Sequence, residues 1–309
     1  MHVTESIEFV LKPNSPYDFA RTVGHVTGNA GEYALDKFVD GTYTRVLSIN
    51  DHHVLLSVQS SGSLKQTKLA CNLSALEGPL HSANEFQQMT SWMFSVDDDL
   101  SSFYGMASQD PFLRDLIEDF HGLQILRSPS LFESIVISIL GQQISASVAR
   151  KMRSDLIKIY GGSYESKGVE YYFFPAAEIF ADVTSEELRG IGLSRRKAEY
   201  ILGASKLITS GSLSAEFLKH KSDAEVLSAL TSIDGIGPWT ANWLSIRSLG
   251  RPDGFPANDL ALRRALTRIT NAHEVVTEKE AQEMSLKWIP HRSLVTTYLF
   301  AALRNGAIK

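Results

Sequence analysis

A glycine-rich turn and a lone aspartate are the residues of this chain best suited to chemistry, and Asp259 lies 22 positions after Gly237. The turn, residues 234–237, joins two apolar helical segments, and Pro238 begins the second of them. Glycine supplies the backbone freedom that such a turn needs, and proline is favoured at the first helical position. The free amides at this helix start predict a site for a phosphodiester oxygen. Because short glycine turns are common, a turn that binds nothing is the alternative.

Two tryptophans lie in the helix that follows this turn. Trp239 and Trp243 are four residues apart, so both rings lie on one helix face. Rings at such positions are usually part of a core, although they can equally form one wall of a slot for a flat ring. The helix should end near Gly250, because the Pro- and Gly-rich residues 251–256 cannot form regular structure.

The lone carboxylate has two interpretations. Asn258 or Asp259 begins the next predicted helix, residues 260–270, and an aspartate there is an ordinary N-cap that contributes about 1 kcal/mol. A carboxylate beside a bound phosphodiester could instead stabilise a positive charge that develops during a reaction. The sequence leaves both roles open for Asp259.

The elements that position these residues divide the chain into two parts. Before residue 77, short segments such as 6–11, 42–49 and 53–59 are rich in β-branched residues and predict strands, with one helix inserted at 18–27. From about residue 84, apolar residues recur at helical spacing. We therefore predict an α+β fold, with a small N-terminal antiparallel β-rich domain followed by a mostly α-helical domain. The predicted boundaries are 1–105 for the first domain and 106–309, all helical, for the second.

Composition is that of an ordinary globular protein, with 43% hydrophobic and 21% charged residues. No apolar run approaches the length of a membrane span, and the first residues lack the pattern of a signal peptide. The single cysteine, Cys71, excludes an intramolecular disulfide and a four-cysteine iron–sulfur cluster, and it favours a reducing compartment.

The charge is unevenly distributed along the chain. A net charge of −5 argues against a DNA-binding protein, which is expected to carry a basic face. However, residues 1–124 hold 7 Lys/Arg and 16 Asp/Glu, whereas residues 189–270 hold 12 Lys/Arg and 7 Asp/Glu. The part with the glycine turn is therefore the basic one, and local phosphate contacts decide DNA affinity.

The turn and the aspartate together carry a resemblance to a known family. Gly-Ile-Gly-Pro-Trp-Thr-Ala-Asn-Trp, residues 235–243, with Asp259 resembles the helix-hairpin-helix DNA glycosylase superfamily, most closely its 3-methyladenine DNA glycosylase II (AlkA-type) branch. The helix-hairpin-helix motif then lies at about 225–248. Further matching pieces occur in the family's order: Pro16-Tyr17-Asp18-Phe19, Ile139-Leu140-Gly141-Gln142-Gln143-Ile144-Ser145, Leu193-Ser194-Arg195-Arg196-Lys197-Ala198 and Trp288-Ile289-Pro290-His291-Arg292-Ser293.

The resemblance implies a role for each motif. Asp259 becomes the catalytic carboxylate, and Phe300 stands where a larger tryptophan is usual, which implies a roomier base pocket. The pocket walls are Trp239, Trp243 and Phe300, and the DNA-binding hairpin consists of Gly235, Ile236, Gly237 and Trp239.

The glutamine turn within residues 131–160 also gains a role. Taken alone, Gly141-Gln142-Gln143 is as well explained by a simple connection between two helices. In the resembling family this turn is a wedge that enters the duplex where a nucleotide is extruded, and Gln143 aligns with the intercalating side chain. A polar wedge departs from the apolar one usual in the AlkA-type branch. Whether Gln142 or Gln143 enters the duplex is left open.

The resemblance also predicts the reaction type. Bifunctional members of the superfamily form a Schiff base through a lysine two residues after the second hairpin glycine, and here that position is Trp239. We therefore expect a monofunctional enzyme that uses water. No cofactor and no metal cluster are expected, although a monovalent cation held by the hairpin backbone near Gly235 is compatible with the resemblance.

The implied function is excision of alkylated purines of the 3-methyladenine and 7-methylguanine type by base flipping and N-glycosidic hydrolysis, in base excision repair. The alternatives are a same-fold glycosylase for deaminated or oxidised bases and a non-catalytic helix-hairpin-helix DNA-binding protein. The expected partner is damaged double-stranded DNA. We expect a monomer without a membrane partner, in the cytoplasm and, in a prokaryote, associated with the nucleoid.

Overall fold

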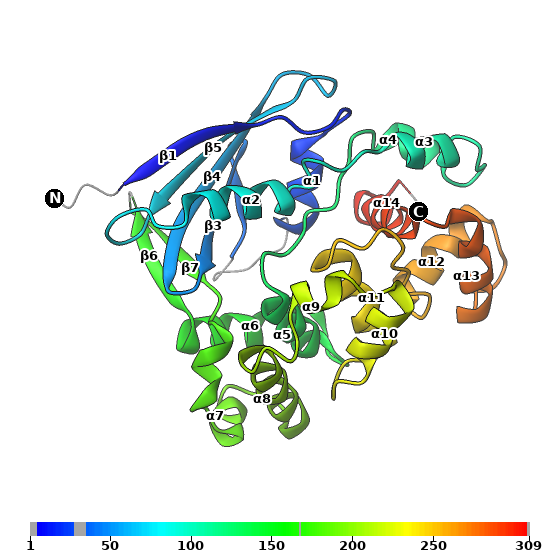
Figure 1. Ribbon diagram of the computed structural model, residues 1–309. Coiled ribbons are helices and arrows are strands. Elements are labelled where there is room, and N and C mark those ends of the chain that lie inside the picture. The colour runs from blue at the N-terminus through cyan, green and yellow to red at the C-terminus, as the bar shows by residue number, and fades with distance from the viewer. Residues whose placement is uncertain (1–4, 28–34, 167, 308–309) are drawn as a thin grey trace.

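An antiparallel sheet and a larger set of helices form the two parts of the protein in the computed structural model, which describes residues 5–27, 35–166 and 168–307 (Figure 1). This arrangement confirms the predicted α+β fold class. No helix in these described ranges is long and apolar enough to cross a membrane. Cys71 is buried with a free thiol, and burial raises its pKa to about 12.

The N-terminal sheet has five antiparallel strands in the order β1-β5-β4-β3-β2. The predicted strands correspond to β1, β3 and β4, while β2 and β5 were not predicted. Alternate side chains of β5 are buried, as expected for a sheet with one covered face. Helices α1 and α2 pack on this face around Tyr43, Phe86 and Phe94. The bounds are β1 Ser6–Leu11, α1 Phe19–Thr27, β2 Lys37–Val39, β3 Thr42–Ile49, β4 His52–Ser61, β5 Lys68–Ala75 and α2 Ala83–Met93.

A two-stranded hairpin, β6 (Gly162–Ser166) with β7 (Val169–Phe173), departs from the prediction that residues 106–309 are helical throughout. Its aromatic residues Tyr164, Tyr171 and Phe173 pack on Val46 and Leu55 of the N-terminal sheet. These apolar partners lie more than 100 positions earlier in the chain. A tertiary contact, rather than a local pattern, therefore sets the conformation of the segment.

The helices build two further cores. One is formed by α5 to α11, and the other by α12 to α14 with α3 and α4, which lie beside α14 in Figure 1. Leu100 and Phe103 pack in the second core together with Ala107, so residues on both sides of positions 105 and 106 share one core. The bounds are α3 Ser101–Ala107, α4 Arg114–Asp119, α5 Leu131–Gly141, α6 Ala146–Tyr160, η1 Ala177–Ala181, α7 Ser185–Gly190, α8 Arg195–Thr209, α9 Ala215–Lys219, α10 Asp223–Thr231, α11 Pro238–Arg247, α12 Leu260–Ile269, α13 Glu278–Ser285, η2 Leu286–Trp288 and α14 Arg292–Asn305.

A buried ion pair connects the sheet to α5, and its arginine also binds Asp36. Arg45 on β3 donates to Glu133 with an Nη2–Oε2 distance of 2.5 Å, and to Asp36 with an Nη1–Oδ1 distance of 2.9 Å. Burial by itself raises the pKa of Asp36, but the Arg45 guanidinium and the Tyr43 hydroxyl hold it below its ordinary value. Removing either partner of the Arg45–Glu133 pair would leave an uncompensated buried charge, so this pair links the position of α5 to that of β3.

Candidate functional site

The glycine turn joins α10 to α11 with a geometry that requires glycine at its first position. Gly235 has a φ of +86°, and a Cβ there would lie 2.4 Å from ring carbons of Tyr200. Both the left-handed backbone and this close approach exclude a larger residue. The predicted helix-hairpin-helix turn is therefore built into the packing of α8 against the hairpin.

Gly237 has no such requirement within the protein. It is the N-cap of α11 with a φ of −85°, and no atom lies within 4 Å of the position of a Cβ. It provides no side-chain cap, so the first amides of α11 keep hydrogen-bonding capacity for an external acceptor. Pro238 occupies the first helical position, as predicted. The exposed helix start can thus admit an anion close to its amides.

Asp259 is the N-cap of α12, and it does more than cap. Its Oδ1 accepts the amide N–H of Leu262 at 3.0 Å, as an N-cap side chain does. Its Oδ2 accepts the indole N–H of Trp239 at 2.5 Å, although the two residues lie on different helices. The structure therefore brings the lone carboxylate to the first turn of α11.

The segment between α11 and α12 is held by residues that sequence reasoning did not single out. The side-chain oxygen of Asn242 accepts the amide N–H of Phe255 at 2.8 Å. Arg292 of α14 donates to Asp253 through Nε and Nη2, at 2.8 Å and 2.5 Å. A Cβ on Gly254 would lie 2.6 Å from the Ile246 side chain. These contacts hold the segment against α11 and α14, and the segment leads directly to Asp259 beside Trp239.

The three predicted pocket residues form one aromatic wall. The ring centroids of Trp239 and Trp243 are 6.1 Å apart at an interplanar angle of 61°, and those of Trp243 and Phe300 are 5.2 Å apart at 64°. All three rings are partly exposed. Edge-to-face contacts of this kind are favourable arrangements of aromatic rings. The wall runs from the carboxylate on α12 to the last helix, α14.

The glutamine turn between α5 and α6 lies against the hairpin. Gln142 donates through Nε2 to the carbonyl of Gly235 at 2.8 Å, so its side chain is used within the protein. Gln143 is exposed and has a φ of +56°, an uncommon value for a residue with a side chain. Lys197 of α8 is buried and donates to the carbonyl of Leu140 at 2.8 Å, which supports the end of α5. Burial lowers the pKa of Lys197. The two glutamines are therefore not equivalent.

The expected hairpin cation stays a prediction. The carbonyl of Gly235 accepts from Gln142, and the carbonyl of Ile233 accepts from the amide of Ile236. Each of these oxygens retains a second lone pair that could face a cation. No group of three or more His, Cys, Asp or Glu residues suited to a metal ion occurs among the described residues.

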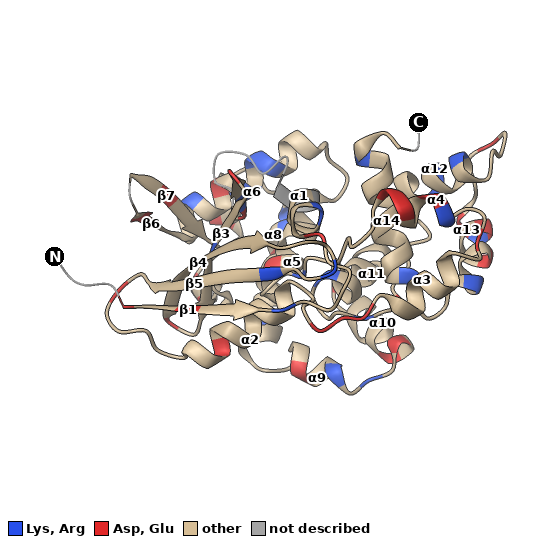
Figure 2. Cartoon of the chain, turned by 90° about the horizontal axis from the view of Figure 1, so that it is seen from above, with Lys and Arg blue, Asp and Glu red and all other residues tan. Residues whose placement is uncertain are grey.

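The basic residues near the site lie mainly on the helical part. Figure 2 shows α12, which carries Arg263, Arg264 and Arg268, at the end of the molecule away from the start of β1. Arg264 and Arg268 are exposed, as are Arg195 and Arg196 at the start of α8. This placement follows the charge asymmetry of the sequence.

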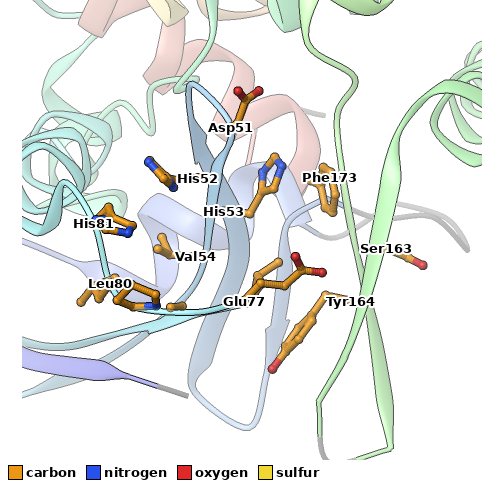
Figure 3. Close-up of a pocket in the computed structure, with 13 residues that line it drawn as sticks. Asp51, His52, His53, Val54, Glu77, Leu80, His81, Ser163, Tyr164 and Phe173 are labelled. Carbon is orange, nitrogen blue, oxygen red and sulfur yellow. The ribbon is translucent and has the colours of Figure 1, made fainter. Parts of the chain in front are cut away.

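A separate cavity of about 360 Å³ lies between the N-terminal sheet and the β6–β7 hairpin, and Asp259 is not among the residues that line it. Figure 3 shows His53 of β4 beside Phe173 of β7, with His52 and His81 on the other side. The rings of His53 and Phe173 are stacked with centroids 4.3 Å apart, and burial lowers the pKa of His53. The stacking helps to attach the β6–β7 hairpin to the sheet.

Comparison with known proteins agrees with this arrangement. Residues 136–291 match the family model described as HhH-GPD superfamily base excision DNA repair protein. A Bacillus subtilis protein named DNA-3-methyladenine glycosylase is 31% identical over 287 residues, 93% of this chain and 94% of that protein. A solved 3-methyladenine DNA-glycosylase from Archaeoglobus fulgidus has a TM-score of 0.82 at 25% identity, covering 97% of this chain and 100% of that chain. A Clostridium acetobutylicum 8-oxoguanine glycosylase/lyase shares the fold, with a TM-score of 0.76 at 20% identity over 99% of each chain.

The family match covers the parts of the molecule that form the candidate site. It begins within α5 and ends at His291, the residue before α14, so it includes the glutamine turn, the hairpin and Asp259. The similarity to the Bacillus subtilis protein extends over nearly the whole of both chains. The chain therefore belongs to the HhH-GPD superfamily of base excision DNA repair proteins.

Proposed function

We propose that this protein is a monofunctional DNA glycosylase that excises alkylated purines of the 3-methyladenine and 7-methylguanine type from damaged duplex DNA. The observation that carries the proposal is the carboxylate of Asp259, held beside an aromatic wall and next to an open helix start. The names of the Bacillus subtilis and Archaeoglobus fulgidus relatives support the same substrate class. The acting unit is a monomer, since one chain supplies all these groups.

The hairpin is the proposed grip on DNA. Amides at the start of α11, in front of Gly237, hold one phosphate oxygen, helped by the positive end of the helix dipole. Such contacts fix the position of the protein on the duplex without reading its sequence. They place the sugar next to the phosphate within reach of the segment that carries Asp259.

The aromatic wall is the proposed base pocket. A purine alkylated at N3 or N7 carries a positive charge, and the faces of Trp239, Trp243 and Phe300 attract such a ring. The glycosidic bond of an alkylated purine is already weak, so stacking with few hydrogen bonds is enough for selectivity. Flipping the nucleotide out of the stack costs a few kcal/mol, which binding in the pocket offsets.

The carboxylate stabilises the transition state. Departure of the base builds positive oxocarbenium character on the sugar, and the negative charge of Asp259 beside C1′ lowers the energy of that state. The base leaves with the electrons of the glycosidic bond and so becomes neutral, while water adds to C1′ and releases a proton, which leaves an abasic site. The position of a lyase lysine is Trp239, which has no amine, so no Schiff base forms there.

A panel of duplexes with one lesion each tests this proposal. We expect excision of 3-methyladenine and 7-methylguanine, with strand breaks only after alkali and no adduct trapped by borohydride during turnover. Preferred excision of hypoxanthine or 8-oxoguanine would assign the protein to the alternative substrate classes. A borohydride-dependent adduct abolished by replacing one lysine would contradict the monofunctional mechanism. Binding without excision of any lesion would indicate a non-catalytic DNA-binding protein.

The glutamine turn is the proposed wedge, with Gln143 as the residue that enters the duplex. Gln143 is exposed at the tip of the turn, whereas the side chain of Gln142 is already bonded to the hairpin. Gln143→Ala is expected to lower the single-turnover excision rate about fivefold, because the gap left by the flipped nucleotide loses a hydrogen-bonding partner. A fluorescent base opposite the lesion measures the loss of the extruded state.

Gln142→Ala is the matched control for this variant. It removes a side chain of the same type from the neighbouring position, but its expected effect is a looser hairpin with weaker binding to all duplexes alike. If Gln142→Ala abolished extrusion and Gln143→Ala did not, the wedge assignment would be reversed.

A further inference from the structure

The hydrogen bond between Trp239 and Asp259 assigns the indole a role beyond stacking. We propose that Trp239 is a positioning residue that fixes the carboxylate of Asp259 through its N–H; this rests on the function proposed above. The evidence is the 2.5 Å distance from Nε1 of Trp239 to Oδ2 of Asp259. Hydrogen bonds to an ionised acceptor are shorter and stronger than neutral ones.

The indole provides the second of two contacts that hold the carboxylate. The amide of Leu262 donates to Oδ1 at 3.0 Å. This hydrogen bond alone holds only one of the two carboxylate oxygens in place. The hydrogen bond from Trp239 holds Oδ2 as well, so that α12 fixes one oxygen and α11 fixes the other. A carboxylate has about four acceptor sites, so both oxygens can still face the sugar or a water molecule. The indole therefore orients the carboxylate, which keeps its negative charge and free acceptor sites.

The same contact links the DNA grip to the carboxylate. Trp239 lies two residues after Gly237, so the proposed phosphate-binding amides and the indole belong to one helical turn of α11. Asn242, one turn later, holds the segment before Asp259 through the amide of Phe255. A phosphate bound at the start of α11 is thus at a fixed place relative to the carboxylate. Accurate placement of this kind is what an electrostatic contribution to catalysis requires.

Trp243 provides a comparison within the same wall. It lies one turn after Trp239 on α11, and the two rings are in edge-to-face contact. Its Nε1 is buried and has no hydrogen-bond partner among the described residues. Replacing either tryptophan with phenylalanine keeps an aromatic ring in the wall. Only the change at Trp239 removes a hydrogen bond from the carboxylate.

The experiment compares Trp239→Phe with Trp243→Phe in single-turnover excision of an alkylated purine and in binding to an abasic-site analogue. We expect Trp239→Phe to lower the excision rate about tenfold, because the variant loses one hydrogen bond to a charged group. Trp243→Phe should lower the rate less. Binding to the abasic analogue should change less than about twofold in Trp239→Phe, which also shows that the variant is folded.

Two readouts separate positioning from packing. In the Asp259→Asn background, Trp239→Phe should change the residual rate less than about twofold, because its partner has lost the charge that it positions. In spectra of protein labelled with ¹⁵N at the indoles, Asp259→Ala should move the Trp239 N–H resonance more than that of Trp243. A tryptophan that acts only through the packing of its ring in the wall would give neither result.

The outcomes distinguish the inference from the proposed function. Equal losses in Trp239→Phe and Trp243→Phe, with Asp259→Asn inactive, would overturn the positioning role and leave the glycosylase mechanism intact. A full Trp239→Phe effect in the Asp259→Asn background would overturn it as well. Wild-type rates in Asp259→Asn would contradict the catalytic role of Asp259 and with it the positioning role, whereas a wild-type protein that excised no alkylated purine would contradict the proposed function itself.

Discussion

Asp259→Asn is expected to lower the single-turnover rate of alkylpurine excision by about 10²–10³-fold, the range seen when one preorganised electrostatic group is removed. Asparagine still accepts a hydrogen bond from the amide of Leu262, so α12 keeps its cap. Because its NH2 group replaces the other carboxylate oxygen, asparagine in this rotamer cannot also accept the hydrogen bond from Trp239. The variant thus loses the negative charge at the proposed position of C1′, together with the hydrogen bond from Trp239.

Binding and a second substitution provide the controls. Affinity for an abasic-site analogue should stay close to that of the wild type, because the proposed phosphate contacts lie at the start of α11 and do not involve Asp259. Asp259→Ser, which also keeps an N-cap side chain, should be as inactive as Asp259→Asn. If both variants excised at the wild-type rate, Asp259 would be an N-cap without a role in the chemistry.

Gly237→Ala is expected to weaken binding about 10- to 100-fold for all duplexes, damaged or not, since one or two amide contacts to a charged phosphate would be lost. The fold should tolerate the change, because the φ of Gly237 is ordinary and no protein atom lies within 4 Å of the new Cβ. The added methyl group would instead occupy the space in front of the helix amides. Fluorescence anisotropy at several salt concentrations measures the affinity and its salt dependence.

Gly190→Ala is the matched control for the hairpin variant. Gly190 is the last residue of α7, outside the hairpin, and a Cβ there also meets no atom within 4 Å. Its replacement should leave DNA affinity unchanged. Gly235→Ala is unsuitable for this test, because the strained backbone and the contact with Tyr200 would disturb the hairpin itself. Unchanged affinity in Gly237→Ala would exclude the hairpin as the DNA anchor.

Several features of the site could be predicted from the sequence because they depend on local chemistry. The turn that ends at Gly237, the helix start at Pro238 and the N-cap at Asp259 each follow from the preferences of one to four adjacent residues. Helical spacing placed Trp239 and Trp243 on one face, and their rings are in contact. The resemblance then added Phe300, which the structure places against Trp243.

The tertiary structure alone decided which of these groups meet. The sequence by itself determined the α+β class, the glycine turn, the cap and the helix faces, because hydrophobic period and capping act over a few residues. It could not show the bond from Trp239 to Asp259, the bond from Gln142 to Gly235, or the β6–β7 hairpin packed on the sheet. Each of these joins segments 20 or more positions apart, and such contacts are set by the packing of whole elements rather than by local preference. For this reason the carboxylate was predictable as a residue, but its place beside the indole was not.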